Sequence, residues 1–374
     1  MKVLNYCSKC LTTSLRPNSK FVGDVCIACH YFDNADNRPE VVFRELKGLL
    51  RSFKKRKNQD YDCIVGVSGG KDSLRQAIWV RDRLNLKPLL VSVAYPPKQL
   101  SDIGAKNIEN MINHNFDIVQ ISPAPQTSRE LSLQSFTKFG NVCKSTEIAL
   151  FSGVPRVAIE WGIRLIFWGE NPALQVGDSA AGGVSPLDGN NLRNLNTLTD
   201  GGEKWMDVKD EYKTSCYKYP SKSAFLKDDI QIIYLGAAWD DWSTFLNSTL
   251  GALSGLTLRP NQRNITGDYS EASMLDEEFT NINMMLKYYK YGFGRATDQM
   301  NELIRNGHIT RDRAIEIVNE LDGKCDDSII RSYCSYVGIT YQQFWDIAYD
   351  FVNWELFKMG NTERPIPTFV VGKG

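Results

Sequence analysis

The stretch Ser68-Gly69-Gly70-Lys71-Asp72-Ser73 decides how this 374-residue chain is interpreted. It follows an apolar run at 63–67, which predicts a buried strand, and it precedes an amphipathic segment at 74–84, which predicts a helix. A glycine-rich turn between a strand and a helix directs backbone N–H groups and the positive end of the helix dipole toward an anion. Because Gly69 and Gly70 have no Cβ, a phosphate can approach the backbone closely. The sequence therefore predicts a phosphate site at residues 68–73.

The letters of this loop indicate which kind of phosphate site it is. A Walker A motif has four residues between its first glycine and Gly-Lys, and then Ser or Thr. Here Gly66 stands one residue too close to Gly70, and Asp72 follows Lys71. The loop instead resembles the PP-loop of ATP pyrophosphatases, which implies ATP cleavage between the α- and β-phosphates. The alternative is a chance Gly-Gly turn before a helix.

Four cysteines near the N-terminus form two Cys-x2-Cys pairs, with fifteen residues between the pairs: Cys7, Cys10, Cys26 and Cys29. This spacing is typical of a zinc ribbon, and four thiolates leave no open position for catalysis, so we expect structural Zn²⁺. His30 leaves a Cys3His variant open, and two disulfides are the other alternative. No signal peptide precedes the first pair, so we expect a reducing, cytoplasmic setting.

Composition narrows the class of protein. Lys and Arg together number 44, as do Asp and Glu, and this balance argues against a large nucleic-acid footprint. Hydrophobic residues make up 42% of the chain, which is ordinary for a globular protein. No apolar run approaches the length of a membrane span, so we expect no transmembrane helix.

Apolar runs alternate with helical stretches from residue 60 onward. This pattern predicts an α/β fold with a doubly wound parallel sheet, helices on both faces and a ligand at the carboxyl ends of the strands. The predicted strands are 63–67, 89–93, 116–121, 165–168 and 231–235, with a helix near 101–114 and a helical region broken at Pro155. Helices are also predicted at 274–291, after Thr310 and at 340–358. The expected domains are a zinc ribbon at 1–38, a linker helix at 39–59, an ATP-binding domain at 60–260 and a helical C-terminal region at 261–374.

Two further segments carry candidate site residues. Trp168-Gly169-Glu170-Asn171-Pro172 follows the fourth strand, so Glu170 can hold Mg²⁺ or orient a substrate, unless it is an exposed loop carboxylate. The stretch 289–298 places Lys290 and Arg295 beside two glycines, a composition suited to an anion. The stretch 304–311 follows as a turn into a helix.

Taken together, the ribbon, SGGKDS, WGEN, KYGFGRATD and IRNGHITR resemble the N-acetyl sugar amidotransferase family of bacterial surface-polysaccharide synthesis, along nearly the whole chain. The resemblance implies a PP-loop fold of the adenine nucleotide alpha-hydrolase-like type. It also implies an activity that converts an acetamido group of a nucleotide-linked sugar, a uronic acid derivative, to an acetamidino group. ATP and ammonia would be consumed, and AMP and pyrophosphate released. A separate glutaminase subunit with a cyclase-like barrel subunit would supply the ammonia.

Roles for the loop residues follow from that chemistry. Ser68, Gly69, Gly70 and Ser73 would cradle the pyrophosphate, while Lys71 and a Mg²⁺ ion held partly by Asp72 would neutralise its charge. Glu170 would bind the metal or accept a proton from ammonia. Asn171, Lys290 and Arg295 are the candidate substrate-binding residues, with Arg295 on a phosphate or carboxylate.

Two alternatives remain open. A tRNA thiolase of the same superfamily would use cysteines as sulfur carriers, and Cys143 with Cys216 would be the candidate pair. A nucleotide-sensing module would bind ATP without turnover. The chain has only His30, His114 and His308, in separate regions, so we expect no Cys–His glutaminase site within it.

Overall fold

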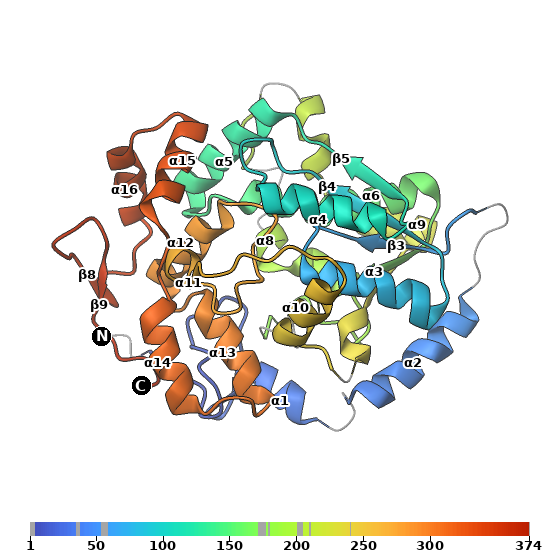
Figure 1. Ribbon diagram of the computed structural model, residues 1–374, viewed down its shortest axis with the longest axis horizontal. Helices are drawn as coiled ribbons and strands as arrows, with labels where there is room; N and C mark the ends of the chain where they lie inside the picture. Colours follow the sequence, from blue (N-terminus) through green and yellow to red (C-terminus); the bar gives the residue numbers. More distant parts are fainter. Residues whose placement is uncertain are drawn as a thin grey trace.

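The computed structural model describes residues 4–34, 38–53, 59–170, 177–178, 180–199, 205–208, 211–239 and 241–373. These residues form an α/β fold with a five-stranded parallel sheet, an N-terminal four-cysteine cluster and a helical C-terminal region (Figure 1). The predicted fold class is confirmed. The described part of the chain begins and ends on the side of the molecule away from the sheet.

The central sheet has the strand order β5-β4-β3-β6-β7, and all neighbouring strands are parallel. All five predicted strands are present: β3 (Cys63–Gly66), β4 (Pro88–Val93), β5 (Ile118–Ile121), β6 (Leu165–Trp168) and β7 (Gln231–Tyr234). The chain moves outward in one direction from β3 to β5 and then in the other from β6 to β7. The order therefore reverses between β3 and β6, and such a switch point opens a crevice at the carboxyl ends of the strands.

Helices cover both faces of the sheet, as predicted. Successive side chains of a strand point to opposite faces, and Val65 and Ile64 of β3 accordingly belong to two different cores. The first core includes residues of α2 (Pro39–Ser52) and α3 (Lys71–Leu84), and the second includes residues of α6 (Lys144–Trp161) and α9 (Lys222–Asp228). The helix predicted as a linker, α2, thus packs against the sheet through Val42 and Leu46.

The predicted break at Pro155 does not occur. The helix α6 continues through Pro155 without interruption. Two helices precede α6 in the chain, α4 (Asp102–Asn113) and α5 (Pro125–Phe139). A proline inside a helix costs roughly 3 kcal/mol or more. Val154 and Val157 on either side are buried against the sheet, and we infer that this packing offsets the cost.

From Thr280 to Tyr349 the C-terminal region consists of helices joined by short turns, and a small hairpin follows. Thr310 caps a helix as predicted, with its hydroxyl accepting from Arg313 N at 3.4 Å. The last predicted helix, at 340–358, is too long, because it ends at Tyr349. Trp354 lies beyond its end and is exposed. The elements are α12 (Thr280–Tyr291), α13 (Arg295–Arg305), α14 (Arg311–Leu321), α15 (Asp327–Val337), α16 (Tyr341–Tyr349), β8 (Phe357–Lys358) and β9 (Ile366–Pro367).

The four-cysteine unit, residues 4–33, packs against this C-terminal region, and its helix α1 (Ile27–Asp33) lies beside α13 in Figure 1. Leu11 N donates to Asn301 Oδ1 of α13 at 2.6 Å. Arg16 pairs with Asp298 of the same helix, which also pairs with Lys287 Nζ at 2.7 Å. These two cations hold the pKa of the Asp298 carboxyl well below its usual range. The remaining elements are β1 (Phe21–Val22), β2 (Val25–Cys26), α1 (Ile27–Asp33), η2 (Asn190–Asn194), α8 (Asn196–Thr199), η3 (Glu211–Tyr217), η4 (Leu235–Ala238), α10 (Thr244–Leu253) and α11 (Arg263–Thr266).

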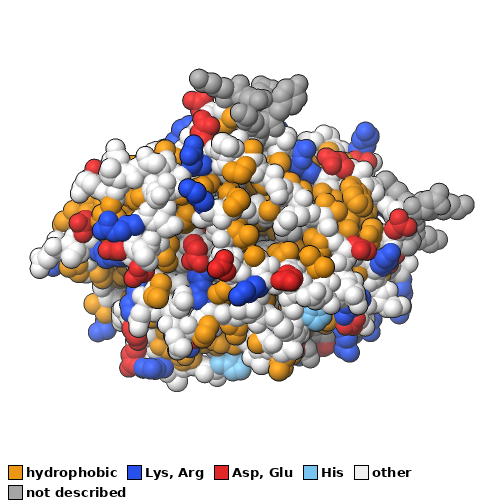
Figure 2. Space-filling model, turned by 45° about the horizontal axis from the view of Figure 1, so that its top comes forward, with side chains coloured by type: hydrophobic (Ala, Val, Ile, Leu, Met, Phe, Trp, Pro, Cys, Tyr) orange, Lys and Arg blue, Asp and Glu red, His pale blue; other side chains and the backbone are white. Residues whose placement is uncertain are grey.

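Within the described ranges, no helix is both long and apolar enough to cross a membrane. On the face shown in Figure 2, Lys and Arg side chains lie among Asp and Glu side chains and form no continuous basic area. This distribution agrees with the equal numbers of basic and acidic residues in the sequence.

Candidate active site

The SGGKDS loop, residues 68–73, joins the carboxyl end of β3 to the start of α3. Gly69 has a φ of +93°, which lies in the left-handed region that favours glycine, and Gly70 is the extended N-cap of α3. Ser73 Oγ donates to Gly70 O at 3.0 Å and so tightens the first helical turn. The first N–H groups of a helix have no partner inside it. The loop therefore has the strand–turn–helix geometry of an anion site.

Lys71 and Asp72 form an ion pair within the loop, with 2.7 Å between Nζ and Oδ2. Lys71 is 5% exposed, so its ammonium faces the interior of the site. Asn247 of α10 donates from Nδ2 to Asp72 Oδ1, and Arg75 donates to the side-chain oxygen of Asn247. Because Asn247 is fully buried, this relay fixes the orientation of the Asp72 carboxylate.

An irregular segment at residues 271–279 lies against the loop. Met274 has a φ of +53°, a conformation that is rare outside glycine. Ser101, the N-cap of α4, donates from its backbone N to Asp276 O at 3.2 Å, and Tyr95 Oη donates to Asp276 Oδ2 at 2.8 Å. These contacts turn the Asp276 side chain toward the loop, where burial raises its pKa.

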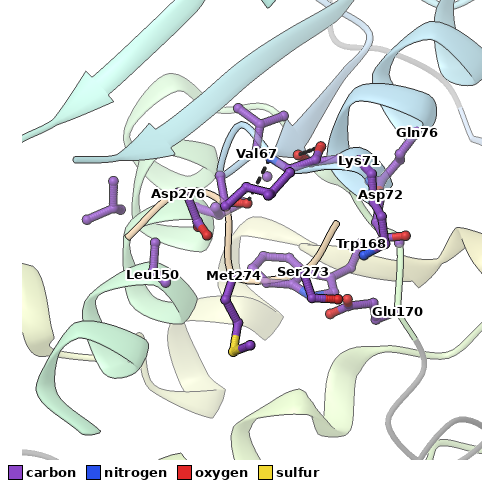
Figure 3. Close-up of a pocket in the computed structure, with 18 of the residues that line it drawn as sticks. Val67, Lys71, Asp72, Gln76, Leu150, Trp168, Glu170, Ser273, Met274 and Asp276 are labelled. Carbon is purple, nitrogen blue, oxygen red and sulfur yellow. Dashed lines mark hydrogen bonds and ion pairs between the residues drawn. The ribbon is translucent and has the colours of Figure 1, made fainter. Parts of the chain in front are cut away.

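The loop and this segment enclose a cavity of about 280 Å³, the loop cavity. In Figure 3, Asp276 and Leu150 lie on one side of it, and Asp72, Gln76 and Glu170 lie on the other. Gln76 is 1% exposed, and its side-chain nitrogen has no hydrogen-bond partner among the described residues. A polar wall and a buried unpaired donor are typical of a ligand site.

Glu170 and Arg295 complete the loop cavity. Burial among surrounding groups raises the pKa of Glu170, and Asp72 adds to this shift while Lys71 and Arg295 oppose it. The Glu170 side chain is nonetheless open to the cavity, so we expect water to limit the shift. Arg295 donates to Ser273 Oγ, and its Nε is buried without a hydrogen-bond partner among the described residues. The cavity therefore has cationic groups from both its loop side and its C-terminal side.

The structure brings most of the predicted site residues together and separates one. Seven of them line the loop cavity: Ser68, Gly70, Lys71, Asp72, Ser73, Glu170 and, from α13, Arg295. Gly69 belongs to the loop but does not line the cavity. Lys290 does not line this cavity, and its Nζ donates to the carbonyls of Phe139 and Gly140 at 3.0 and 3.2 Å. Lys290 thus caps the C-terminus of α5 and lies outside the candidate site. Asn171 lies outside the described residues.

Sequence reasoning missed Gln76, Tyr95, Ser273 and Asp276. It predicted a helix from Met274, but α12 begins only at Thr280. A left-handed Met274 cannot continue a helix, and the buried Glu277 carboxylate accepts from the backbone N of Phe279 and Thr280 at the helix start. The acidic run at 276–278 was the available signal, because acidic residues are common just before and inside the first turn of a helix.

The four predicted metal ligands, Cys7, Cys10, Cys26 and Cys29, are buried and form one cluster. Their sulfur atoms all lie within 4.8 Å of one another, with Cys10 and Cys26 at 3.7 Å and Cys7 and Cys29 at 4.0 Å. All four are free thiols, so the disulfide alternative does not apply. A tetrahedral ion with bonds of about 2.3 Å has ligand atoms about 3.8 Å apart. The cluster therefore has the size and ligand set of a tetrahedral metal site.

The cysteines considered as sulfur carriers lie elsewhere. Cys143 is 2% exposed, with its Sγ 3.9 Å from Glu277 Oε1, and burial raises the pKa of its thiol well above the usual value. Cys216 packs in a core beside α6. Neither lines the loop cavity. A sulfur carrier needs an accessible thiolate, so this arrangement does not favour the thiolase alternative.

Residues 267–368 match a family model described as "LPS biosynthesis protein WbpG-like, C-terminal domain". A search of curated proteins found no match to the chain. The matched region holds the segment at 271–279 and α13, and it therefore supplies Ser273, Asp276 and Arg295 to the loop cavity. Residues 267–368 of this chain are thus similar to the C-terminal domain of WbpG-like proteins.

Proposed function

We propose that this protein is an ATP-dependent amidotransferase that converts an acetamido group of a nucleotide-linked sugar, a UDP-uronic acid derivative, to an acetamidino group. One observation carries the proposal: residues of a WbpG-like region line the same cavity as the SGGKDS loop. On this proposal, the phosphate-binding loop and the WbpG-like region contribute to the same reaction. The other candidates, a tRNA thiolase and a nucleotide sensor, have no comparable support.

The chemistry suits these residues. An amide carbon is a poor electrophile, so its oxygen must first become a good leaving group. The acetamido oxygen attacks the α-phosphorus of ATP, the bond to pyrophosphate breaks, and an imidate adenylate forms. Ammonia then adds to the carbon, the C–O bond breaks, and AMP leaves with the original acetamido oxygen. The net products are the acetamidino sugar, AMP and pyrophosphate.

The loop residues would act on the charge that develops on the departing pyrophosphate. Backbone N–H groups at 68–73 would bind its oxygens, and Lys71 would donate to them from its buried position. Mg²⁺, when bound, would neutralise phosphate charge, and Asp72 and Glu170 are the carboxylates that we propose to hold it. Glu170, whose side chain is open to the cavity, would take a proton from attacking ammonia.

We propose Zn²⁺ as the ion at the four-cysteine cluster, since a set of four thiolates is the usual ligand set of structural zinc. Ammonia would come from a separate glutaminase subunit with a cyclase-like barrel subunit. This agrees with the positions of the histidines. His30 Nε2 lies 3.4 Å from Val22 O, and His114 Nε2 lies 2.8 Å from Ser254 O. None of the three histidines lines the loop cavity.

The test is mass spectrometry of UDP-linked N-acetylated uronic acids after incubation with the protein, ATP and ammonium. The proposal expects a sugar in which NH replaces oxygen, together with AMP and pyrophosphate. The variant Asp72→Ala should lose most turnover and remain folded. ADP and phosphate as the main products would contradict the proposal, and ATP binding without any turnover would favour the sensor.

A further inference from the structure

A second cavity, of about 380 Å³, adjoins the loop cavity. The two share Lys71, Asp72, Glu170 and Arg295, so they meet at the groups expected to surround the reacting phosphate. If ATP places its phosphates at the SGGKDS loop, the acceptor must bring its oxygen to this junction from another direction. The second cavity provides that approach.

The lining of the second cavity combines aromatic rings with cations. The aromatic members are Tyr31, Phe32, Trp239 and Trp242, and the cationic members besides those at the junction are Arg38 and Arg305. Trp239 is 3% exposed, and its ring N–H is buried without a hydrogen-bond partner among the described residues. Flat bases stack on aromatic rings, and guanidinium groups bind phosphates with paired hydrogen bonds. This combination suits a ligand with a base and a diphosphate.

The acidic members of this lining away from the junction are already engaged. Glu302 accepts from the backbone N and the hydroxyl of Thr244. Asp298 pairs with Arg16 and with Lys287. These carboxylates therefore oppose an anionic ligand less than their number suggests.

The four-cysteine unit forms one wall of this cavity. Its helix α1 begins after Cys26, contains Cys29 and carries Tyr31 and Phe32 into the lining. A metal ion at the cluster would thus fix the helix that presents these rings. Contacts from Leu11 to Asn301 and from Arg311 to Cys10 O, at 2.6 and 3.4 Å, hold the unit against α13 and α14.

We propose that the second cavity binds the nucleotide-sugar acceptor with its acetamido group at the junction, and that the four-cysteine unit is part of this binding site. The inference rests on the proposed function and adds to it the place of the acceptor. It also gives the four-cysteine unit a direct role in substrate binding, beyond its contribution to stability.

The test measures binding of two probes by titration calorimetry: a UDP-linked N-acetylated uronic acid, and an ATP analogue that cannot be cleaved between the α- and β-phosphates. Phe32→Ala is the main variant, because Phe32 is 47% exposed and its loss should not unfold the unit. Val22→Ala is the matched control, since Val22 is 57% exposed in the same unit and lies outside the cavity lining. Arg38→Ala, with exposed Arg44→Ala as its control, tests the cationic part.

We expect Phe32→Ala to weaken binding of the sugar nucleotide about tenfold, the lower part of the range for losing one aromatic stacking contact. Binding of the ATP analogue and both control variants should stay close to wild type. If the wild-type protein converts the sugar but neither Phe32→Ala nor Arg38→Ala weakens its binding, the inference is wrong and the proposed function stands. If these variants weaken the ATP analogue instead, the cavity holds the adenosine. If wild type releases no AMP with any sugar nucleotide, the proposed function itself fails.

Discussion

Replacing Gly104 by alanine should destabilise the protein, although the residue lies in a helix. A Cβ at this position would meet Asp276 O at 2.4 Å, Asp276 Cα at 2.8 Å and the Asp276 carbonyl carbon at 2.9 Å. These are backbone atoms, and Ser101 binds the same segment through its backbone N and hydroxyl. The clash therefore cannot be relieved by rotating a side chain. The segment that carries Asp276 into the loop cavity must move.

Two effects compete at this position. Alanine is favoured over glycine in a helix by at most about 1 kcal/mol. Overpacking in a well-packed region costs about 1–3 kcal/mol, and contact with a fixed backbone favours the upper part of that range. We expect the clash to prevail, with a net loss of about 1–2 kcal/mol in the free energy of unfolding.

Gly48 provides the matched control. It lies inside helix α2, and a Cβ there would meet nothing within 4 Å. Gly48→Ala should therefore raise stability by about 0.5–1 kcal/mol. Equilibrium urea unfolding of wild type and both variants, followed by circular dichroism, measures the difference. If Gly104→Ala proves as stable as Gly48→Ala, the close packing of α4 against the segment at 271–279 is refuted.

Three further predictions concern charge, metal and substrate. Burial raises the pKa of Glu277 from 4.5 to about 8, so the folded state binds the proton on this carboxyl more tightly than the unfolded state does. The stability that this proton contributes is complete below pH 4.5 and is lost as the pH rises toward 8. Between pH 5 and pH 7 the unfolding free energy of wild type should therefore fall by up to about 2.7 kcal/mol relative to Glu277→Gln, and parallel urea-derived profiles would disprove this. Purified protein should contain one zinc ion by elemental analysis, and Cys7→Ser should lose it; full zinc in that variant would rule out the four-thiolate site. Arg295→Lys should raise the apparent KM for the sugar nucleotide nearly as much as Arg295→Ala, because a point charge does not replace a guanidinium fork; an increase confined to the KM for ATP would assign Arg295 to the other ligand.

Local sequence patterns were sufficient to predict the sheet and the two strongest motifs. Each strand is a short apolar run next to a turn or a helix, and parallel strands buried on both faces produce that pattern. The four-cysteine cluster was predictable because the spacing within each pair sets the geometry of two thiolates. The SGGKDS loop was predictable because the backbone conformation of Gly69 depends mainly on that residue and its neighbours.

The opposite wall of the loop cavity depends on contacts between distant residues. The segment at 271–279 has apolar residues at helical spacing, yet it is held out of a helix by Ser101 and Tyr95, more than 170 positions away in the chain. The position of Lys290 also depends on contacts with distant residues. Its neighbouring glycines suggested an anion site, but tertiary packing turns its ammonium to carbonyls of α5, about 150 positions earlier.

The most direct test of the central claim follows the acetamido oxygen. A sugar nucleotide with heavy oxygen in its acetamido group would be incubated with the protein, unlabelled ATP and ammonium. If that oxygen attacks the α-phosphorus, the heavy isotope must appear in the phosphate of AMP, while pyrophosphate stays unlabelled. Mass spectrometry of both products gives the answer. Labelled AMP is the predicted result, and unlabelled AMP formed together with the acetamidino sugar would contradict the adenylated imidate.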